Sequence, residues 1–206
     1  MEAKLSIRAV IFDFGSVLVQ MGEETPRLAL AERLGVPLKE LNRLVFDSES
    51  AVRAMVGELT IAQHWQAVGT ALGVLPDEMP AVVAQFWSAD LVNEELVAVI
   101  RKLRPNYKVG LLSNAWDDLR QVLATRIPIG HLFDDLVISA EVHMGKPDPS
   151  IYYLAVERLG VQPNEAVFVD DVLANVEAAS AIGLNAIHYQ NNPQLFSDLV
   201  KYNIFA

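Results

Sequence analysis

Residues 8–18 read RAVIFDFGSVL, a short run of apolar and β-branched side chains that ends at Asp13. Its apolar part, residues 8–12, shows no alternation of polar and apolar positions, which is typical of a strand covered on both faces in a parallel sheet. Similar runs recur at residues 108–112, 136–139, 166–169 and 185–189. Together these runs predict a buried parallel sheet.

Helix-like periods separate the later strand-like runs. They lie at residues 94–103, 117–126, 149–159 and 173–182. Several of them end at Gly or Pro, which are common helix stops. The alternation of strand and helix predicts an α/β fold with a doubly wound parallel sheet, connected by right-handed crossovers.

Residues 23–87 break this alternation because only helix-like periods are found there. Breaks at residues 35–37 and 73–76 would separate the helices of a small bundle. We therefore expect an inserted α-helical domain at residues 20–91. The core domain would comprise residues 1–19 and 92–206, with boundaries placed to within a few residues.

The composition excludes several classes of function. Of 206 residues, 52% are hydrophobic and none is cysteine, so the chain is typical of a compact globular protein without disulfides or thiol chemistry. A net charge of −10 repels polyanions, which argues against nucleic acid or an anionic membrane as partner. No signal-peptide pattern or membrane-length apolar stretch is present, so we expect a cytoplasmic protein. No motif indicates the oligomeric state.

Polar side chains follow the strand-like runs, where doubly wound sheets bind their ligands. These residues are Asp13, Ser113, Asn114, Asp170 and Asp171, together with Lys146 in the segment that opens a helix after the third run. Taken alone, each would be interpreted as a turn, cap or surface residue. As a set they combine carboxylates, a hydroxyl and a cation at one edge of the sheet.

This set suits phosphoryl transfer, in which a protein positions the phosphate and neutralises its charge. The carboxylate of Asp13 can attack phosphorus, and Lys146 and Ser113 can bind phosphate oxygens. Two adjacent carboxylates, Asp170 and Asp171, repel each other unless a cation lies nearby. Magnesium prefers such oxygen ligands, so the set predicts a Mg²⁺ cofactor.

Four segments resemble the ordered motifs of the haloacid dehalogenase-like hydrolases: FDFGSVL, LLSNA, GKPDPSIY and FVDDVLANVEAA. The resemblance covers nearly the whole chain, and the helical insertion lies between the first two motifs, as in members with a small α-helical cap. It implies a Rossmann-like core and a magnesium-dependent hydrolase. The implied substrate is a small phosphorylated metabolite, with an aspartyl-phosphate as intermediate.

The resemblance also implies roles by position. Asp13 would be the nucleophile, and Ser113 and Lys146 would bind phosphate, with Asn114 beside them. The metal ligands would be Asp13, the carbonyl of Gly15, Asp171 and, nearby or through water, Asp170. Asn175 stands where a further Asp often lies. Trp116, directly after the second motif, would line the substrate pocket, whereas Trp65 and Trp87 are expected inside the cap.

Gly15 departs from the phosphatase pattern, which has a second Asp there as general acid and base. Losing such a group costs roughly 10²–10⁴ in rate. The cost is smaller for acidic leaving groups, such as anomeric sugar phosphates or acyl phosphates. The chain is similar to an Asp-x-Gly subgroup that includes an α-glucose-1-phosphate phosphatase.

Two alternatives stay open at the sequence level. A haloacid dehalogenase would need neither the acid at position 15 nor a metal. A phosphate-binding or regulatory protein could keep the site without turnover. The four histidines, His64, His131, His143 and His188, lack metal-ligand spacing and are expected to be structural, although His143 could substitute as a proton carrier.

Overall fold

The computed structural model describes residues 6–204, and its centre is a five-stranded parallel sheet in the order β5-β4-β1-β6-β7. The strands are β1 (Ala9–Phe12), β4 (Lys108–Ser113), β5 (Asp135–Ile138), β6 (Ala166–Asp170) and β7 (Asn185–His188). The predicted α/β fold with a parallel sheet is confirmed. Because β4 and β6 flank β1, their carboxyl ends lie beside that of β1.

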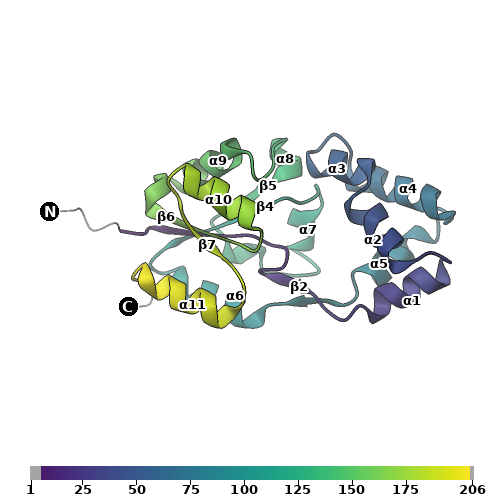
Figure 1. The fold of residues 1–206 in the computed structure, drawn as a ribbon, viewed down its shortest axis with the longest axis horizontal. Helices are drawn as coiled ribbons and strands as arrows, with labels where there is room; N and C mark the ends of the chain where they lie inside the picture. The colour runs from purple at the N-terminus through teal and green to yellow at the C-terminus, as the bar shows by residue number, and fades with distance from the viewer. Residues whose placement is uncertain (1–5, 205–206) are drawn as a thin grey trace.

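Helices cover both faces of this sheet (Figure 1). They are α6 (Glu94–Leu103), α9 (Pro149–Leu159), α10 (Leu173–Ala181) and α11 (Asn192–Lys201). Side chains alternate along a strand, so Val10 and Phe12 face the core shared with α6 and α11. Ala9 and Ile11 pack on the opposite face with α9 and α10. This two-sided burial explains the continuous apolar runs.

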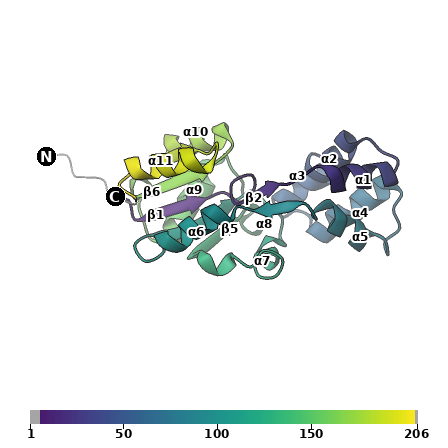
Figure 2. The same ribbon diagram turned by 90° about the horizontal axis from the view of Figure 1, so that it is seen from below.

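A second group of helices lies at one end of the molecule, beyond the carboxyl ends of the central strands (Figures 1 and 2). It comprises α1 (Thr25–Arg33), α2 (Leu38–Phe46), α3 (Glu49–Met55), α4 (Ile61–Leu72) and α5 (Met79–Phe86). We call this group the helical insertion. Its start signals are local: Ser48 caps α3, and Thr60 forms a capping box with Gln63 at α4. The helical insertion has its own apolar core.

An antiparallel pair of short strands joins the helical insertion to the sheet. It consists of β2 (Val19–Met21) and β3 (Asp90–Val92). This pair was not predicted, because three-residue strands leave no periodic pattern. The expected boundaries at residues 19/20 and 91/92 fall within these strands, and the division into two domains stays a prediction.

Within residues 6–204, no helix has the length and hydropathy needed to cross a membrane.

Some predicted elements differ from the structure. The helix expected at residues 117–126 is reduced to α7 (Leu119–Val122). From Ala124 onward, ahead of Pro128, the backbone N–H groups bond to a mixture of i−3, i−4 and i−5 carbonyls, so the regular helical pattern ends. Helix α11 was not predicted, although Asn191 caps it. Short elements also missed are η1 (Gly130–Leu132), α8 (Ser139–Val142) and η2 (Pro163–Glu165).

Several hydrogen bonds hold the helical insertion against the core. The hydroxyl of Ser139 lies 2.6 Å from the carbonyl oxygen of Met55, and the backbone N–H of Ile61 donates to Asp117 at 2.9 Å. Gly57 has a φ of +75°, and a Cβ there would lie 2.1 Å from the carbonyl oxygen of Ala140. This close approach therefore requires glycine.

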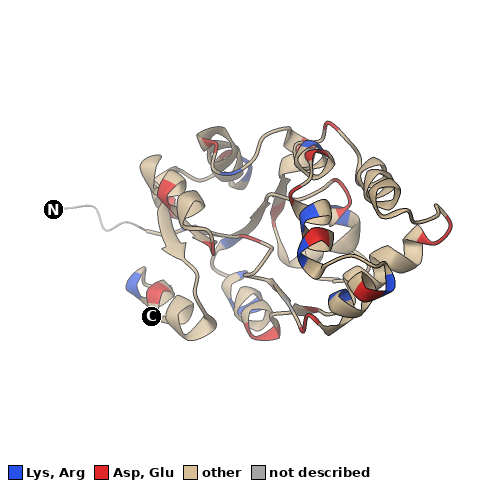
Figure 3. Ribbon diagram, turned by 45° about the vertical axis from the view of Figure 1, so that its right-hand side comes forward, with Lys and Arg blue, Asp and Glu red and all other residues tan. Residues whose placement is uncertain are grey.

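Acidic and basic residues are interspersed along the helices of both parts (Figure 3). Several of them form exposed pairs within one helix, such as Glu40 with Arg43 and Asp198 with Lys201. Such pairs contribute little to stability. The expectation that nucleic acid is not a partner stays a prediction.

Candidate functional site

Lys146 bridges two aspartates at the carboxyl end of the sheet. Its Nζ lies 2.7 Å from Oδ1 of Asp13, which follows β1, and 2.6 Å from Oδ2 of Asp170, which ends β6. The exposed fractions are 6% for Lys146, 7% for Asp13 and 0% for Asp170. The structure thus brings together three of the predicted site residues in one buried ionic cluster.

Asp170 is held by further donors. Its Oδ1 accepts from the backbone N–H of Val172 at 2.8 Å, and the side-chain amide of Asn175 lies 3.1 Å from each carboxylate oxygen. Asn175 is itself buried. Asn175 therefore fixes the orientation of Asp170, and Asp170 in turn holds Lys146.

The cluster shifts the protonation of its members. Burial raises the pKa of Asp13 to about 6, against the opposing effect of the Lys146 ammonium and with a smaller contribution from Asp170. Burial alone would lower the pKa of Lys146, but the two carboxylates outweigh it and raise that pKa. Lys146 is therefore a fixed positive charge.

The acidic residues can hold a metal ion. Asp13, Asp170 and Asp171 each offer a carboxylate oxygen, and these oxygens lie within 4.8 Å of one another. Three carboxylates and one ammonium leave a formal charge of −2 when all are ionised. Hard oxygen donors with this excess charge fit a magnesium ion. The carbonyl of Gly15 accepts from the N–H of Val17 at 2.7 Å and keeps a second lone pair.

Ser113 and Asn114 follow β4, the neighbour of β1. Ser113 is buried. Both ends of the Asn114 amide contact the backbone of Lys146, accepting from its N–H and donating to its carbonyl at 2.8 Å each. The side chain predicted for substrate binding thus fixes Lys146, while direct binding of substrate by Asn114 stays a prediction.

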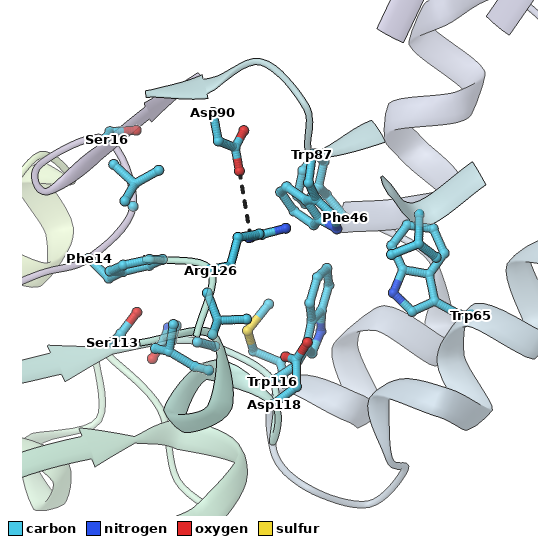
Figure 4. A pocket seen from close by; sticks show the side chains of 18 residues that line it. Phe14, Ser16, Phe46, Trp65, Trp87, Asp90, Ser113, Trp116, Asp118 and Arg126 are labelled. Atoms are coloured by element: carbon cyan, nitrogen blue, oxygen red, sulfur yellow. Dashed lines mark ion pairs between the residues drawn. The ribbon is translucent and has the colours of Figure 1, made fainter. Parts of the chain in front are cut away.

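A cavity of about 400 Å³ lies between this end of the sheet and the helical insertion (Figure 4). Gly15, Ser113 and Asn114 line the side next to the ionic cluster. The other lining residues are Phe14, Ser16, Val19, Phe46, Met55, Trp65, Val83, Trp87, Asp90, Ala115, Trp116, Asp118, Leu119, Val122 and Arg126. Trp116 lines the cavity, as expected from its position.

Two side chains expected inside the cap, Trp65 and Trp87, do pack in the core of the helical insertion. They also line the cavity, which was not expected. His143, considered as a proton carrier, is not among the lining residues, and its Nδ1 lies 3.0 Å from the carbonyl oxygen of Val56. The ring therefore contacts the helical insertion, and a role of His143 as proton carrier stays a prediction.

The other histidines have structural positions. His64 is buried between the carbonyl of Val45 and the hydroxyl of Ser50, at 3.0 and 2.9 Å. The Nε2 of His188 lies 2.9 Å from the carbonyl oxygen of Asp171, and His131 is exposed. These placements match the structural roles expected from the sequence.

Sequence reasoning missed a charged group at the far side of the cavity. Asp90 pairs with the buried Arg27 at 3.1 Å and lies 3.9 Å from Arg126, whose guanidinium stands over the ring of Trp87 at 5.6 Å. Asp118 also lines the cavity, and burial raises its pKa. No motif marks these residues, because they come from separate segments that only the fold brings together.

Comparisons with known proteins agree with this architecture. Bifunctional epoxide hydrolase 2 of Sus scrofa is 27% identical over 96% of this chain, which spans 39% of that protein's length. A phosphorylated carbohydrates phosphatase of Thermotoga maritima is 41% identical over 31% of this chain and 29% of its own. The chain is thus similar in sequence to these two proteins.

A solved structure shows the same fold. It is a haloacid dehalogenase family enzyme from Bacteroides thetaiotaomicron in complex with magnesium and inorganic phosphate, with a TM-score of 0.76 and 21% identity. The match covers 93% of this chain and 100% of that one. A family model for haloacid dehalogenase-like hydrolases matches residues 7–183, and the chain therefore belongs to the haloacid dehalogenase-like hydrolases.

Proposed function

We propose that the protein is a magnesium-dependent phosphatase, which hydrolyses small phosphorylated metabolites through an aspartyl-phosphate on Asp13. The observation that carries this proposal is the Lys146 ammonium held between Asp13 and Asp170. Asp13 directly precedes Phe14 and Gly15, which line the cavity. A fixed cation beside a nucleophilic carboxylate suits an anionic phosphate ester. The relatives that bind phosphate or act on phosphorylated compounds support the same reaction class.

The reaction would proceed in two displacements at phosphorus. An oxygen of the Asp13 carboxylate attacks phosphorus, and the bond from phosphorus to the ester oxygen breaks, which releases the organic group as its alkoxide or phenolate. Water then attacks the same phosphorus atom and frees inorganic phosphate and the Asp13 carboxylate. Lys146 and Ser113 would bind the phosphate oxygens through both steps.

The metal ligands would be Asp13, Asp171 and the Gly15 carbonyl, with Asp170 directly or through water. When bound, magnesium supplies positive charge that reduces the repulsion between Asp13 and the phosphate. Asp170 already accepts hydrogen bonds from Lys146, Asn175 and Val172. Its main contribution is therefore to hold Lys146.

Gly15 narrows the range of favourable substrates. Glycine has no side chain to protonate a departing alkoxide, so esters of acidic alcohols would react fastest. Anomeric sugar phosphates, acyl phosphates and aryl phosphates all belong to this group. The identity of the natural substrate, like the cytoplasmic location, is a prediction.

The test is hydrolysis of p-nitrophenyl phosphate and acetyl phosphate by the purified protein, with magnesium and with a chelator. We expect release of inorganic phosphate with magnesium only, and loss of turnover in Asp13→Asn. Asp77→Asn, the same change at an exposed position of the helical insertion, serves as the matched control. Asp13→Asn activity within about tenfold of wild type would contradict the nucleophile, since tenfold is about 1.4 kcal/mol of barrier.

The same assay separates the alternatives. A dehalogenase would release chloride from 2-chloropropionate equally well with chelator, and Asp171 would then have no metal to bind. A phosphate-binding or regulatory protein would bind inorganic phosphate with magnesium but leave every ester intact. Either result would overturn the proposed phosphatase.

A further inference from the structure

The wall of the cavity opposite the ionic cluster is built from aromatic rings. Phe46 and Trp116 lie parallel, with ring centroids 6.3 Å apart and planes 8° from each other, and Trp87 meets Trp116 edge-on at 6.1 Å. Trp65 also belongs to this wall, whereas Phe14 lines the opposite side of the cavity, near Ser113 (Figure 4). Because the rings support one another, the apolar surface is preformed.

Two polar groups of the cavity already have close protein partners. The Asn114 amide is engaged by the backbone of Lys146, and the Asp90 carboxylate by the guanidinium of Arg27. Ser113 lies on the side of the phosphate site. A sugar bound against the aromatic wall would therefore bury hydroxyls where the rings offer few hydrogen-bond partners, which is unfavourable.

We propose that the organic group of the substrate is a largely apolar aromatic or hydrocarbon group that fills this cavity, rather than a polyhydroxylated sugar. This inference rests on the proposed phosphatase function. The cavity is continuous with the phosphate site, since Gly15 and Ser113 line it. Its volume of about 400 Å³ holds roughly ten to fifteen non-hydrogen atoms at about 30 Å³ each.

The first experiment measures kcat and KM with magnesium for phenyl phosphate and for aryl phosphates that carry methyl, propyl or pentyl groups in the para position. These esters have nearly the same leaving-group acidity, so they differ mainly in apolar size. We expect KM to fall by up to about fourfold per added methylene until the cavity is full, with kcat nearly constant. A KM that does not depend on chain length, or a lower KM for glucose 1-phosphate than for every aryl ester, would overturn the inference.

The second experiment measures binding without turnover. All three tryptophans of the chain line the cavity, so intrinsic fluorescence reports its occupancy. We expect octylphosphonate, titrated in the presence of magnesium, to change the emission at a concentration at least about hundredfold below that for methylphosphonate. Equal affinities would contradict an apolar ligand.

A matched pair of substitutions tests the location. Val83 lines the cavity from α5, whereas Val52 on α3 is 59% exposed. Val83→Phe fills part of the space, so we expect about tenfold weaker binding of octylphosphonate and unchanged binding of methylphosphonate. Val52→Phe makes the same change in side chain and should leave both affinities as in the wild type. Equal effects of the two variants would place the apolar site elsewhere.

The outcomes distinguish the inference from the function on which it rests. Hydrolysis of phenyl phosphate without any effect of chain length would overturn the substrate class and leave the phosphatase intact. If the protein hydrolyses none of the phosphate esters, both the substrate class and the phosphatase function are overturned. Preferential turnover of the longer aryl esters, lost in Val83→Phe and kept in Val52→Phe, supports both.

Discussion

The side chain of Asn114 forms two hydrogen bonds of 2.8 Å with the backbone of Lys146, accepting from its N–H and donating to its carbonyl oxygen. These bonds connect the loop after β4 to the loop that carries the cation. The ammonium of Lys146 reaches Asp13 and Asp170 from this position. The geometry of the ionic cluster thus depends on a neutral amide at its edge.

Asn114→Ala should lower kcat by roughly tenfold or more, because losing both hydrogen bonds frees the Lys146 backbone and small misplacements of catalytic groups are costly. The assay is steady-state hydrolysis of p-nitrophenyl phosphate at saturating magnesium. Asn106→Ala, at an exposed position, is the control and should retain full activity. If Asn114→Ala changes KM alone, Asn114 contacts substrate instead.

Asp171→Asn should raise the magnesium concentration for half-maximal activity by about tenfold, equivalent to about 1.4 kcal/mol of binding. The substitution keeps the size of the side chain and removes one negative charge from the acidic cluster. Unlike Asp13 and Asp170, Asp171 makes no ion pair with Lys146 among the described residues. An unchanged magnesium dependence would exclude Asp171 as a ligand.

Folding stability should fall at mildly acidic pH through His64. Burial lowers the pKa of His64 in the folded protein, while the unfolded chain titrates near 6.5. The neutral ring can donate from Nε2 to Val45 and accept at Nδ1 from Ser50. The stabilisation is therefore complete above about pH 6.5 and is lost as pH falls below it, by at most about 1.4 kcal/mol per pH unit.

Urea unfolding between pH 7 and 5 checks this prediction. His64→Gln should lower stability at neutral pH and reduce the steepness of the acid dependence. His131→Gln, at an exposed histidine, should leave the dependence unchanged. Parallel stability curves for wild type and His64→Gln would show that other groups cause the acid sensitivity.

The sheet could be predicted from sequence because its strands are buried on both faces. Each apolar run had to be continuous, so the five strands were located to within one residue at either end. The pair β2–β3 could not be predicted, since three residues carry no period. Helix α7 was predicted, but with too great a length. The length and position of such elements depend on tertiary contacts.

The residues at the strand ends of the site could be predicted for a related reason. Asp13, Ser113 and Asp170 occupy the carboxyl ends of adjacent strands, so topology places them together. No comparable rule predicts which residues line the cavity. Phe46, Trp87 and Arg126 come from distant segments, and their side chains meet only after the helical insertion packs on the core.

Gly15→Asp tests whether a missing proton donor limits turnover. The backbone at Gly15 is not in the left-handed region, and a Cβ placed there would meet no atom within 4 Å. An aspartate is therefore compatible with the fold, and we expect the urea midpoint to change little. Because Gly15 lines the cavity, we expect the new carboxyl group to extend into it, toward the departing ester oxygen.

The diagnostic quantity is the ratio of rates for two esters. If protonation of the leaving group is limiting, Gly15→Asp should accelerate hydrolysis of an alkyl phosphate by roughly 10²-fold. Hydrolysis of p-nitrophenyl phosphate should change far less, because its phenolate departs without a proton. Gly15→Asn, which adds a side chain of similar size that cannot serve as the acid, is the matched control and should leave the ratio as in wild type. A folded Gly15→Asp variant with intact magnesium dependence and an unchanged ratio would show that another group of the cavity transfers the proton, with Asp118 the first to test by the same ratio in Asp118→Asn.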